Sequence, residues 1–202
     1  IYTWSFWAKR GNIGSYQQMF AAGPVGGGGD TNTASGHTSS VLGGTTNVTS
    51  GGGSIIGGGL KNTASSNYSV IAGGCYNIAA GTSSAIAGGG NNRTTGNYST
   101  VGGGLSANAC CNYTAVVGGY NNKATDLYAG VVAGGSNTAS GLSSFVGAGA
   151  ANIASGNAGS VAVGGMSNAA SGLSSFIGGG KSNAASGCGA VVAGGFSNTA
   201  SG

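Results

Sequence analysis

Charged residues are scarce in this chain of 202 residues: six are basic, two are acidic, and there is a single histidine. The two acids, Asp30 and Asp126, are far apart in the sequence, and His37 is expected on an exposed turn. Acid–base catalysis, a catalytic triad or a metal centre needs such side chains to converge. The sequence therefore predicts a protein that is not an enzyme and has no cofactor and no metal site.

Long basic and long apolar stretches are also missing. The net charge of +4 is spread along the chain, so no row of cations could neutralise the phosphates of a nucleic acid. No apolar run approaches the roughly 20 residues of a membrane-spanning helix. We expect no nucleic-acid partner and no membrane insertion by this segment.

Helical signals are absent as well. No window has apolar residues spaced by three and four, and 47 glycines recur too often for helices of ordinary length. Disorder fits less well than a folded chain, because the glycines are periodic and the intervals between them carry β-branched residues. An all-β fold is the remaining class.

The sequence does contain one dominant pattern, an asparagine that recurs every fifteen residues. The series runs from Asn32 to Asn152, is broken once at Ala107, and resumes at Asn168 after a sixteen-residue turn at 152–168. A fixed period of this kind indicates a repeat architecture. We predict about eleven solenoid turns over residues 26–202.

Each turn has fixed positions when its asparagine is numbered zero. Position two is mostly alanine, position nine is Val or Ile in the regular turns, and position twelve is glycine. A β-branched residue favours a strand, and a recurrent glycine marks a bend. Because positions two and nine are half a turn apart, they predict a parallel β-solenoid (β-roll) with a thin core, an inward column at position nine and a rise of about 4.8 Å per turn.

A second apolar face is visible on the same strands. Positions eight and ten point away from position nine and include Val117, Val132, Phe145 and Phe176. A strand that is apolar on both faces is covered on both, yet a thin roll cannot cover its own outer side. We predict a homo-oligomer in which these residues are subunit contacts.

Residues 1–25 do not follow the repeat and are rich in aromatic side chains, including Trp4, Phe6, Trp7 and Phe20. One hypothesis is that they cap the open end of the solenoid, where strand edges are unpaired. The alternatives are a subunit contact or the tail of a preceding domain.

Four tyrosines share position six: Tyr68, Tyr98, Tyr113 and Tyr128. The last three are in consecutive turns, so their rings should rise along one corner about 4.8 Å apart. Stacking alone would explain them. The functional alternative is an aromatic surface strip that binds sugars or a neighbouring fibre.

The four cysteines, Cys75, Cys110, Cys111 and Cys188, occupy four different positions of the repeat and lack the spacing of a zinc site. In an extended strand, Cys110 and Cys111 would project to opposite sides, which disfavours a bond between them. Free thiols and bridges between subunits both stay open. Five Asn-X-Ser/Thr sequons matter only in a eukaryotic secretory setting; they begin at Asn47, Asn67, Asn92, Asn97 and Asn112.

The segments SVIAGG (69–74), SAIAGG (84–89) and SVAVGG (160–165) alternate with NTASG and NAASG. This pattern resembles the head repeats of the YadA-like trimeric autotransporter adhesins, and equally the repeats of trimeric phage and viral tail-fibre proteins. The resemblance covers about residues 26–202. It implies a left-handed, trimeric β-roll that is extracellular, on a cell or virion surface, and that binds a cell-surface glycan or a matrix protein. The chain departs from the adhesin pattern in its four cysteines and in having neither a coiled-coil stalk nor a membrane-anchor barrel in these residues.

These observations favour an adhesive or structural solenoid, the head or shaft of an adhesin or fibre. An ice-binding solenoid is an alternative, because position three carries a Ser/Thr row that runs from Ser35 to Ser201 with gaps. A subunit of an extracellular filament is a third.

Overall fold

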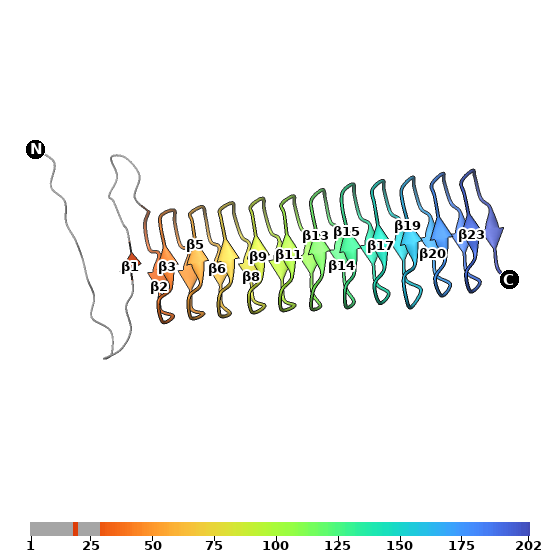
Figure 1. Cartoon of the computed structure of the whole chain (residues 1–202). Helices are drawn as coiled ribbons and strands as arrows, with labels where there is room; N and C mark the ends of the chain where they lie inside the picture. The colour runs from red at the N-terminus through yellow and green to blue at the C-terminus, as the bar shows by residue number, and fades with distance from the viewer. Residues whose placement is uncertain (1–17, 20–28) are drawn as a thin grey trace, which may run out of the picture.

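The computed structural model describes residues 18–19 and 29–202, so the aromatic segment predicted as a cap lies outside the described residues except for Gln18 and Met19. The described chain is an all-β parallel solenoid of about eleven turns with about 15 residues in each. Figure 1 shows the turns stacked in a single row from β2 (Thr33–Ala34) to the last strand, β24 (Thr199–Ala200). The predicted fold class is confirmed.

Each turn contributes one strand to each of two parallel sheets. The first, here the Val/Ile sheet, has the order β1 (Gln18–Met19), β3 (Ser40–Val41), β5 (Ile55–Ile56), β7 (Val70–Ile71), β9 (Ala85–Ile86), β11 (Thr100–Val101), β13 (Ala115–Val116), β15 (Gly130–Val131), β17 (Phe145–Val146), β19 (Val161–Ala162), β21 (Phe176–Ile177) and β23 (Val191–Val192).

The second sheet is here called the Ala sheet. Its order is β2 (Thr33–Ala34), β4 (Val48–Thr49), β6 (Thr63–Ala64), β8 (Ile78–Ala79), β10 (Arg93–Thr94), β12 (Asn108–Ala109), β14 (Lys123–Ala124), β16 (Thr138–Ala139), β18 (Ile153–Ala154), β20 (Ala169–Ala170), β22 (Ala184–Ala185) and β24 (Thr199–Ala200).

Every strand pairs with the equivalent strand of the next turn, as in the register Val101↔Val116. A third row of single-residue bridges follows position thirteen from Thr45 to Phe196. Main-chain hydrogen bonds therefore join each turn to its neighbours, and residues at the same position stack on one another along the rod.

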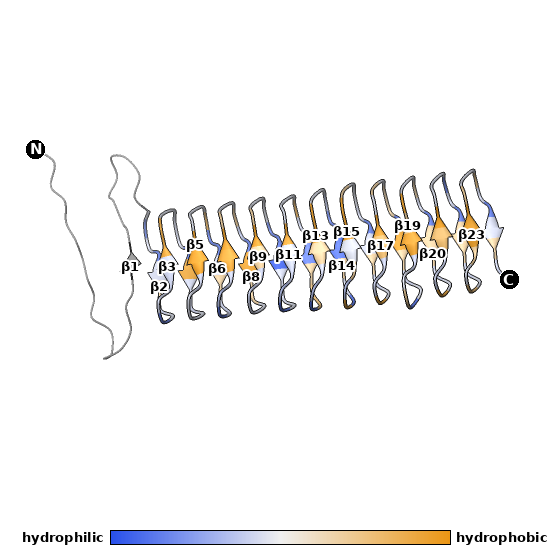
Figure 2. Ribbon diagram, in the orientation of Figure 1, coloured by the Kyte–Doolittle hydropathy of each residue, from blue (hydrophilic) through white to orange (hydrophobic). Residues whose placement is uncertain are grey.

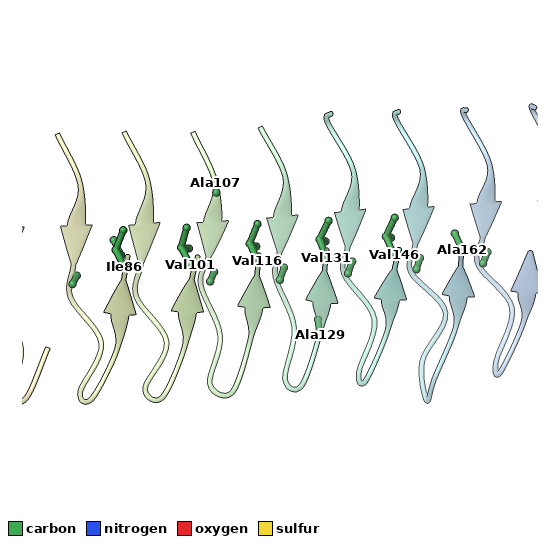
Figure 3. Close-up of a cluster of buried hydrophobic side chains, with 14 of the residues drawn as sticks. Ile86, Val101, Ala107, Val116, Ala129, Val131, Val146 and Ala162 are labelled. Atoms are coloured by element: carbon green, nitrogen blue, oxygen red, sulfur yellow. The ribbon is translucent and has the colours of Figure 1, made fainter. Parts of the chain in front are cut away.

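The core is a thin double column of apolar side chains (Figure 3). Position nine supplies Val or Ile from one sheet, such as Ile71 and Ile177, which are fully buried. Position two supplies alanine from the other sheet. In the sixteen-residue turn Ala162 takes the core position between Val146 and Ile177. The predicted inward column is confirmed.

The recurrent asparagine is also interior. Asn137 is typical: its Oδ1 accepts the backbone N–H of Asn152 at 2.9 Å, and its Nδ2 donates to the carbonyls of Ala133 at 2.9 Å and Gly149 at 3.0 Å. Buried polar groups require such partners. The asparagines therefore form a ladder that satisfies carbonyl groups inside the bends of successive turns.

The bends need unusual backbone. Positions six and fourteen have positive φ in residues other than glycine, for example 57° at Tyr98 and 53° at Asn91. At position twelve glycine is required, because a Cβ on Gly74, whose φ is 91°, would lie 2.1 Å from the carbonyl oxygen of Gly89. The tight stacking of turns thus explains the most regular glycine of the repeat.

Candidate interaction surfaces

The outer face of the Val/Ile sheet is apolar and exposed along the rod. Val117, Val132, Phe145 and Phe176 all lie on it, with 58%, 38%, 39% and 38% of their surface exposed. From Ser40 to Ala193, positions eight and ten of this sheet carry no charged residue. The structure thus places the predicted contact residues on one surface, and their contact with other subunits stays a prediction.

The two aromatic side chains of this face lie beside glycines. A Cβ built on Gly130 would be 3.5 Å from Cδ2 of Phe145, and one on Gly178 would be 3.5 Å from Cε1 of Phe176. Each aromatic ring therefore lies close to a glycine of the same sheet. An uncharged surface can pack against an identical one without leaving a buried charge.

The outer face of the Ala sheet is different. Its positions one and three carry mainly small and hydroxyl-bearing side chains, together with two cations, Arg93 and Lys123. Figure 2 shows the hydrophilic colour at β14, whereas β19 and β23 of the Val/Ile sheet are hydrophobic. The hydroxyl row at position three is interrupted by Ala80 and Cys110.

Three of the four tyrosines at position six stack, as predicted. Ring centroids are 5.3 Å apart for Tyr98 and Tyr113 and for Tyr113 and Tyr128, with interplanar angles of 4° and 19°. Because the rings face one another, the strip presents ring edges and hydroxyl groups to solvent and few free ring faces. Sugars usually pack on ring faces, so this geometry favours a stabilising role for the stack.

The corner beneath these rings supports that interpretation. Tyrosine at positive φ is strained, and the stack offsets part of the cost. A second row of asparagines at position five adds hydrogen bonds, since Oδ1 of Asn112 accepts the N–H of Asn97 at 2.9 Å and Oδ1 of Asn97 accepts that of Thr82 at 2.9 Å. This outer asparagine row was not recognised from the sequence.

The asparagines of the five sequons belong to these two rows, one buried and one exposed. Asn47 and Asn92 belong to the inner ladder and are fully buried, so a glycosyltransferase could not reach them in the folded chain. The side chains of Asn67, Asn97 and Asn112 lie on the exposed corner.

Adjacent Cys110 and Cys111 do not project to opposite sides. Both thiols donate to the carbonyl oxygen of Thr125, at 3.8 Å and 3.1 Å, because the chain leaves β12 after Ala109 and bends. That expectation was therefore wrong. Burial, with the neighbouring Cys111 thiol second, raises the pKa of Cys110 above its usual 9.0. All four cysteines are free in the described chain, and Cys75 and Cys188 are exposed.

His37 is exposed, and within residues 18–19 and 29–202 no group of three or more His, Cys, Asp and Glu side chains is placed to hold a metal ion. The described part of the chain also has no helix long and apolar enough to cross a membrane.

One alignment was missed from the sequence. Arg93, Asn108 and Lys123 occupy position one of three consecutive turns and lie in register on the Ala sheet. Reading position one down the repeat would have found them, because Arg93 and Lys123 are the only charged residues at that position.

Comparisons with protein-family models and with curated proteins gave no match to this chain. The fold and its surfaces are therefore the basis for a functional proposal.

Proposed function

We propose that this chain is a non-enzymatic extracellular rod, the head or shaft of an adhesin or fibre, that self-associates through the outer face of its Val/Ile sheet and binds a cell-surface or matrix partner. The observation that carries the proposal is the contrast between the two outer faces of one thin solenoid. One is apolar and carries no charged residue at positions eight and ten, and the other bears Arg93 and Lys123 among mainly small and hydroxyl-bearing side chains.

The energetics favour covering the apolar face. Full burial of one large apolar side chain contributes about 1.5–3 kcal/mol. Val117, Val132, Phe145 and Phe176 are already partly buried, so assembly adds only the share that belongs to their exposed surface, and this face repeats such side chains along the rod. Exposed apolar patches of this extent usually mark an interaction site. The resemblance to trimeric adhesin and tail-fibre repeats supports three copies and a left-handed roll as the specific form.

The test is the oligomeric state, measured by size-exclusion chromatography with light scattering at micromolar concentration. The wild type should form a defined oligomer, with a trimer expected. The double variant Phe145→Lys/Phe176→Lys should dissociate or fail to assemble, because it places unpaired charges in a desolvated contact.

The Ala sheet provides a matched control. Ile78 and Ile153 lie at position one of β8 and β18, so Ile78→Lys/Ile153→Lys adds the same charge to the opposite face. This control should assemble like the wild type. A well-folded, monomeric wild type, or equal dissociation of both variants, would refute the proposed assembly.

Ice binding has less support than this proposal. It needs one hydroxyl residue repeated on every turn of a flat face, and the position-three row is interrupted at two turns and contains mostly serine. Some of its hydroxyls are also engaged within the protein, as when Oγ1 of Thr95 donates to the carbonyl of Cys110 at 3.1 Å. A filament subunit would associate through the same apolar face. It differs from the proposed oligomer only in that its association is open-ended and forms no closed assembly.

A further inference from the structure

Arg93, Asn108 and Lys123 form a short polar ridge on the outer face of the Ala sheet, here called the cationic ridge. Both cations are exposed, and the strand register places Asn108 directly between them. Neighbouring parallel strands are about 4.8 Å apart, so the two charged residues start from Cα atoms about 10 Å apart. A rigid sheet holds that spacing fixed.

The ridge differs from the other cations of the described chain. Nζ of Lys61 lies 5.5 Å from the centre of the Tyr76 ring, and Nζ of Lys181 lies 5.9 Å from that of Phe196. Within the described residues, Arg93 and Lys123 have no comparable ring contact. Two of the four described cations therefore lie beside an aromatic ring of the protein, and the two on the ridge do not.

Hydrogen bonds within the protein do not explain Asn108, the residue between the two cations. Oδ1 of Asn108 is buried and has no hydrogen-bond partner among the described residues, whereas most turns carry a Thr, Ile, Val or Ala at this position. The hydroxyl of Thr125 flanks the ridge at position three, whereas that of Thr95 donates to the carbonyl of Cys110 at 3.1 Å. The surface thus combines two fixed positive charges with amide and hydroxyl groups.

We propose that the cationic ridge binds a linear polysaccharide bearing sulfate or carboxylate groups, laid along the rod axis. Arg93 and Lys123 each pair with one anionic group, and Nδ2 of Asn108 and the hydroxyl of Thr125 bond to sugar hydroxyls. A nucleic acid fits less well, since its affinity depends on neutralising a longer row of phosphates. This inference rests on the proposed function, in which assembly covers the Val/Ile sheet and leaves the Ala sheet open; binding itself needs only the open Ala sheet.

The test uses the full chain and three labelled probes: a heparin hexasaccharide, a hexagalacturonate, and maltohexaose as the neutral oligosaccharide. Fluorescence anisotropy at low ionic strength should show binding of at least one anionic probe and none of maltohexaose. Added salt should weaken the binding, because exposed charges are screened.

Two double variants that each remove two positive charges distinguish binding at the ridge from a general effect of the net charge. Arg93→Gln/Lys123→Gln should weaken binding about tenfold or more, the effect of losing charge-assisted contacts, whereas Lys61→Gln/Lys181→Gln should remain within about twofold. The charge-preserving Arg93→Lys/Lys123→Arg should retain most of the affinity. Equal weakening by the two glutamine pairs would show that only the net charge matters, and the ridge would be rejected.

Light scattering on the same samples separates this inference from the proposed function. A wild type that assembles but binds neither anionic probe refutes the ridge alone. A monomeric wild type that binds through the ridge refutes the assembly and retains the site. Tighter binding of a single-stranded oligonucleotide than of either anionic sugar would overturn the assignment to polysaccharide.

Discussion

The turn at Asn137 has an amide at position zero of the repeat and the turn at Ala107 has none, although the strands of both turns pair in the same register. At Asn137 the amide bonds to Ala133, Gly149 and Asn152. At Ala107 the backbone N–H still donates to Oδ1 of Asn92, at 2.9 Å, but no amide is present for the corresponding carbonyls of Gly103 and Gly119.

Strand pairing nevertheless continues across the gap, since β12 pairs with β10 and β14 in the same register as everywhere else. Main-chain bonding and the stacked apolar columns therefore set the register. The asparagine ladder has a separate task, which is to satisfy polar groups that the thin interior buries.

Removing another asparagine from the ladder should have the largest effect on the free energy of unfolding. Asn137→Ala leaves the carbonyls of Ala133 and Gly149 without the amide donor and the N–H of Asn152 without its acceptor. Because unsatisfied buried groups are costly, we expect the free energy of unfolding to fall by about 2–4 kcal/mol, measured by urea denaturation followed by circular dichroism. Asn157→Ala, on an exposed corner, is the control and should be nearly neutral. A neutral Asn137→Ala would show that the ladder is dispensable.

Restoring the asparagine that the ladder lacks at Ala107 should change the free energy of unfolding in the opposite direction. Ala107→Asn places an amide where every neighbouring turn holds one, so it should raise the free energy of unfolding by about 1–2 kcal/mol. Ala109→Asn, two residues later, puts the same amide into the apolar core and should destabilise the fold. If both variants lower stability, the turn at Ala107 has relaxed into a shape that excludes asparagine.

A smaller effect is expected inside a turn whose ladder is complete. Thr49 replaces the usual alanine at position two, and its Oγ1 is buried with no partner in the described chain, whereas Oγ1 of Thr94 donates to Oγ of Ser84 at 3.0 Å. We expect Thr49→Ala to stabilise the fold by about 1 kcal/mol. Thr94→Ala should lower stability, and thermal denaturation of both variants would compare them. Similar shifts for the two would contradict this explanation.

The weakest effect concerns reactivity in the gap turn. Because burial and then Cys111 raise the pKa of Cys110 above 9.0, its thiol stays protonated at pH 8 and should be alkylated more slowly than exposed Cys188. The unfolded chain ionises first as the pH rises through 9, so this group makes folding less favourable at alkaline pH. In Cys111→Ser the alkylation of Cys110, followed by mass spectrometry, should accelerate. An unchanged rate would assign the effect to burial alone.

Much of the fold was predictable because every turn repeats the same solution. Val or Ile at position nine predicts a strand and glycine at position twelve predicts a bend, and the structure has both. The role of the recurrent asparagine was not predictable, since a fixed spacing within the repeat does not reveal whether an amide points inward. The direction of Cys110 and Cys111 was mispredicted because it depends on where β12 ends, which no single residue marks.

The surfaces were predictable in part. Phe145 and Phe176 were recognised from their alternation with buried residues. The cationic ridge depends on register between turns, so its members are fifteen residues apart in the sequence and adjacent only after folding. The stacked tyrosines were recognised, but the mutual covering of their ring faces required ring orientations.

The sixteen-residue turn shows how this architecture tolerates change in length. Its extra residue is accommodated at the corner formed by Asn157, Ala158 and Gly159, where Ala158 and Gly159 both have positive φ. The strands on either side keep their partners, Phe145↔Val161 and Val161↔Phe176. This corner can therefore be lengthened without shifting the turns above or below it. A peptide inserted at Ala158 would be displayed at a fixed height on an otherwise unchanged rod.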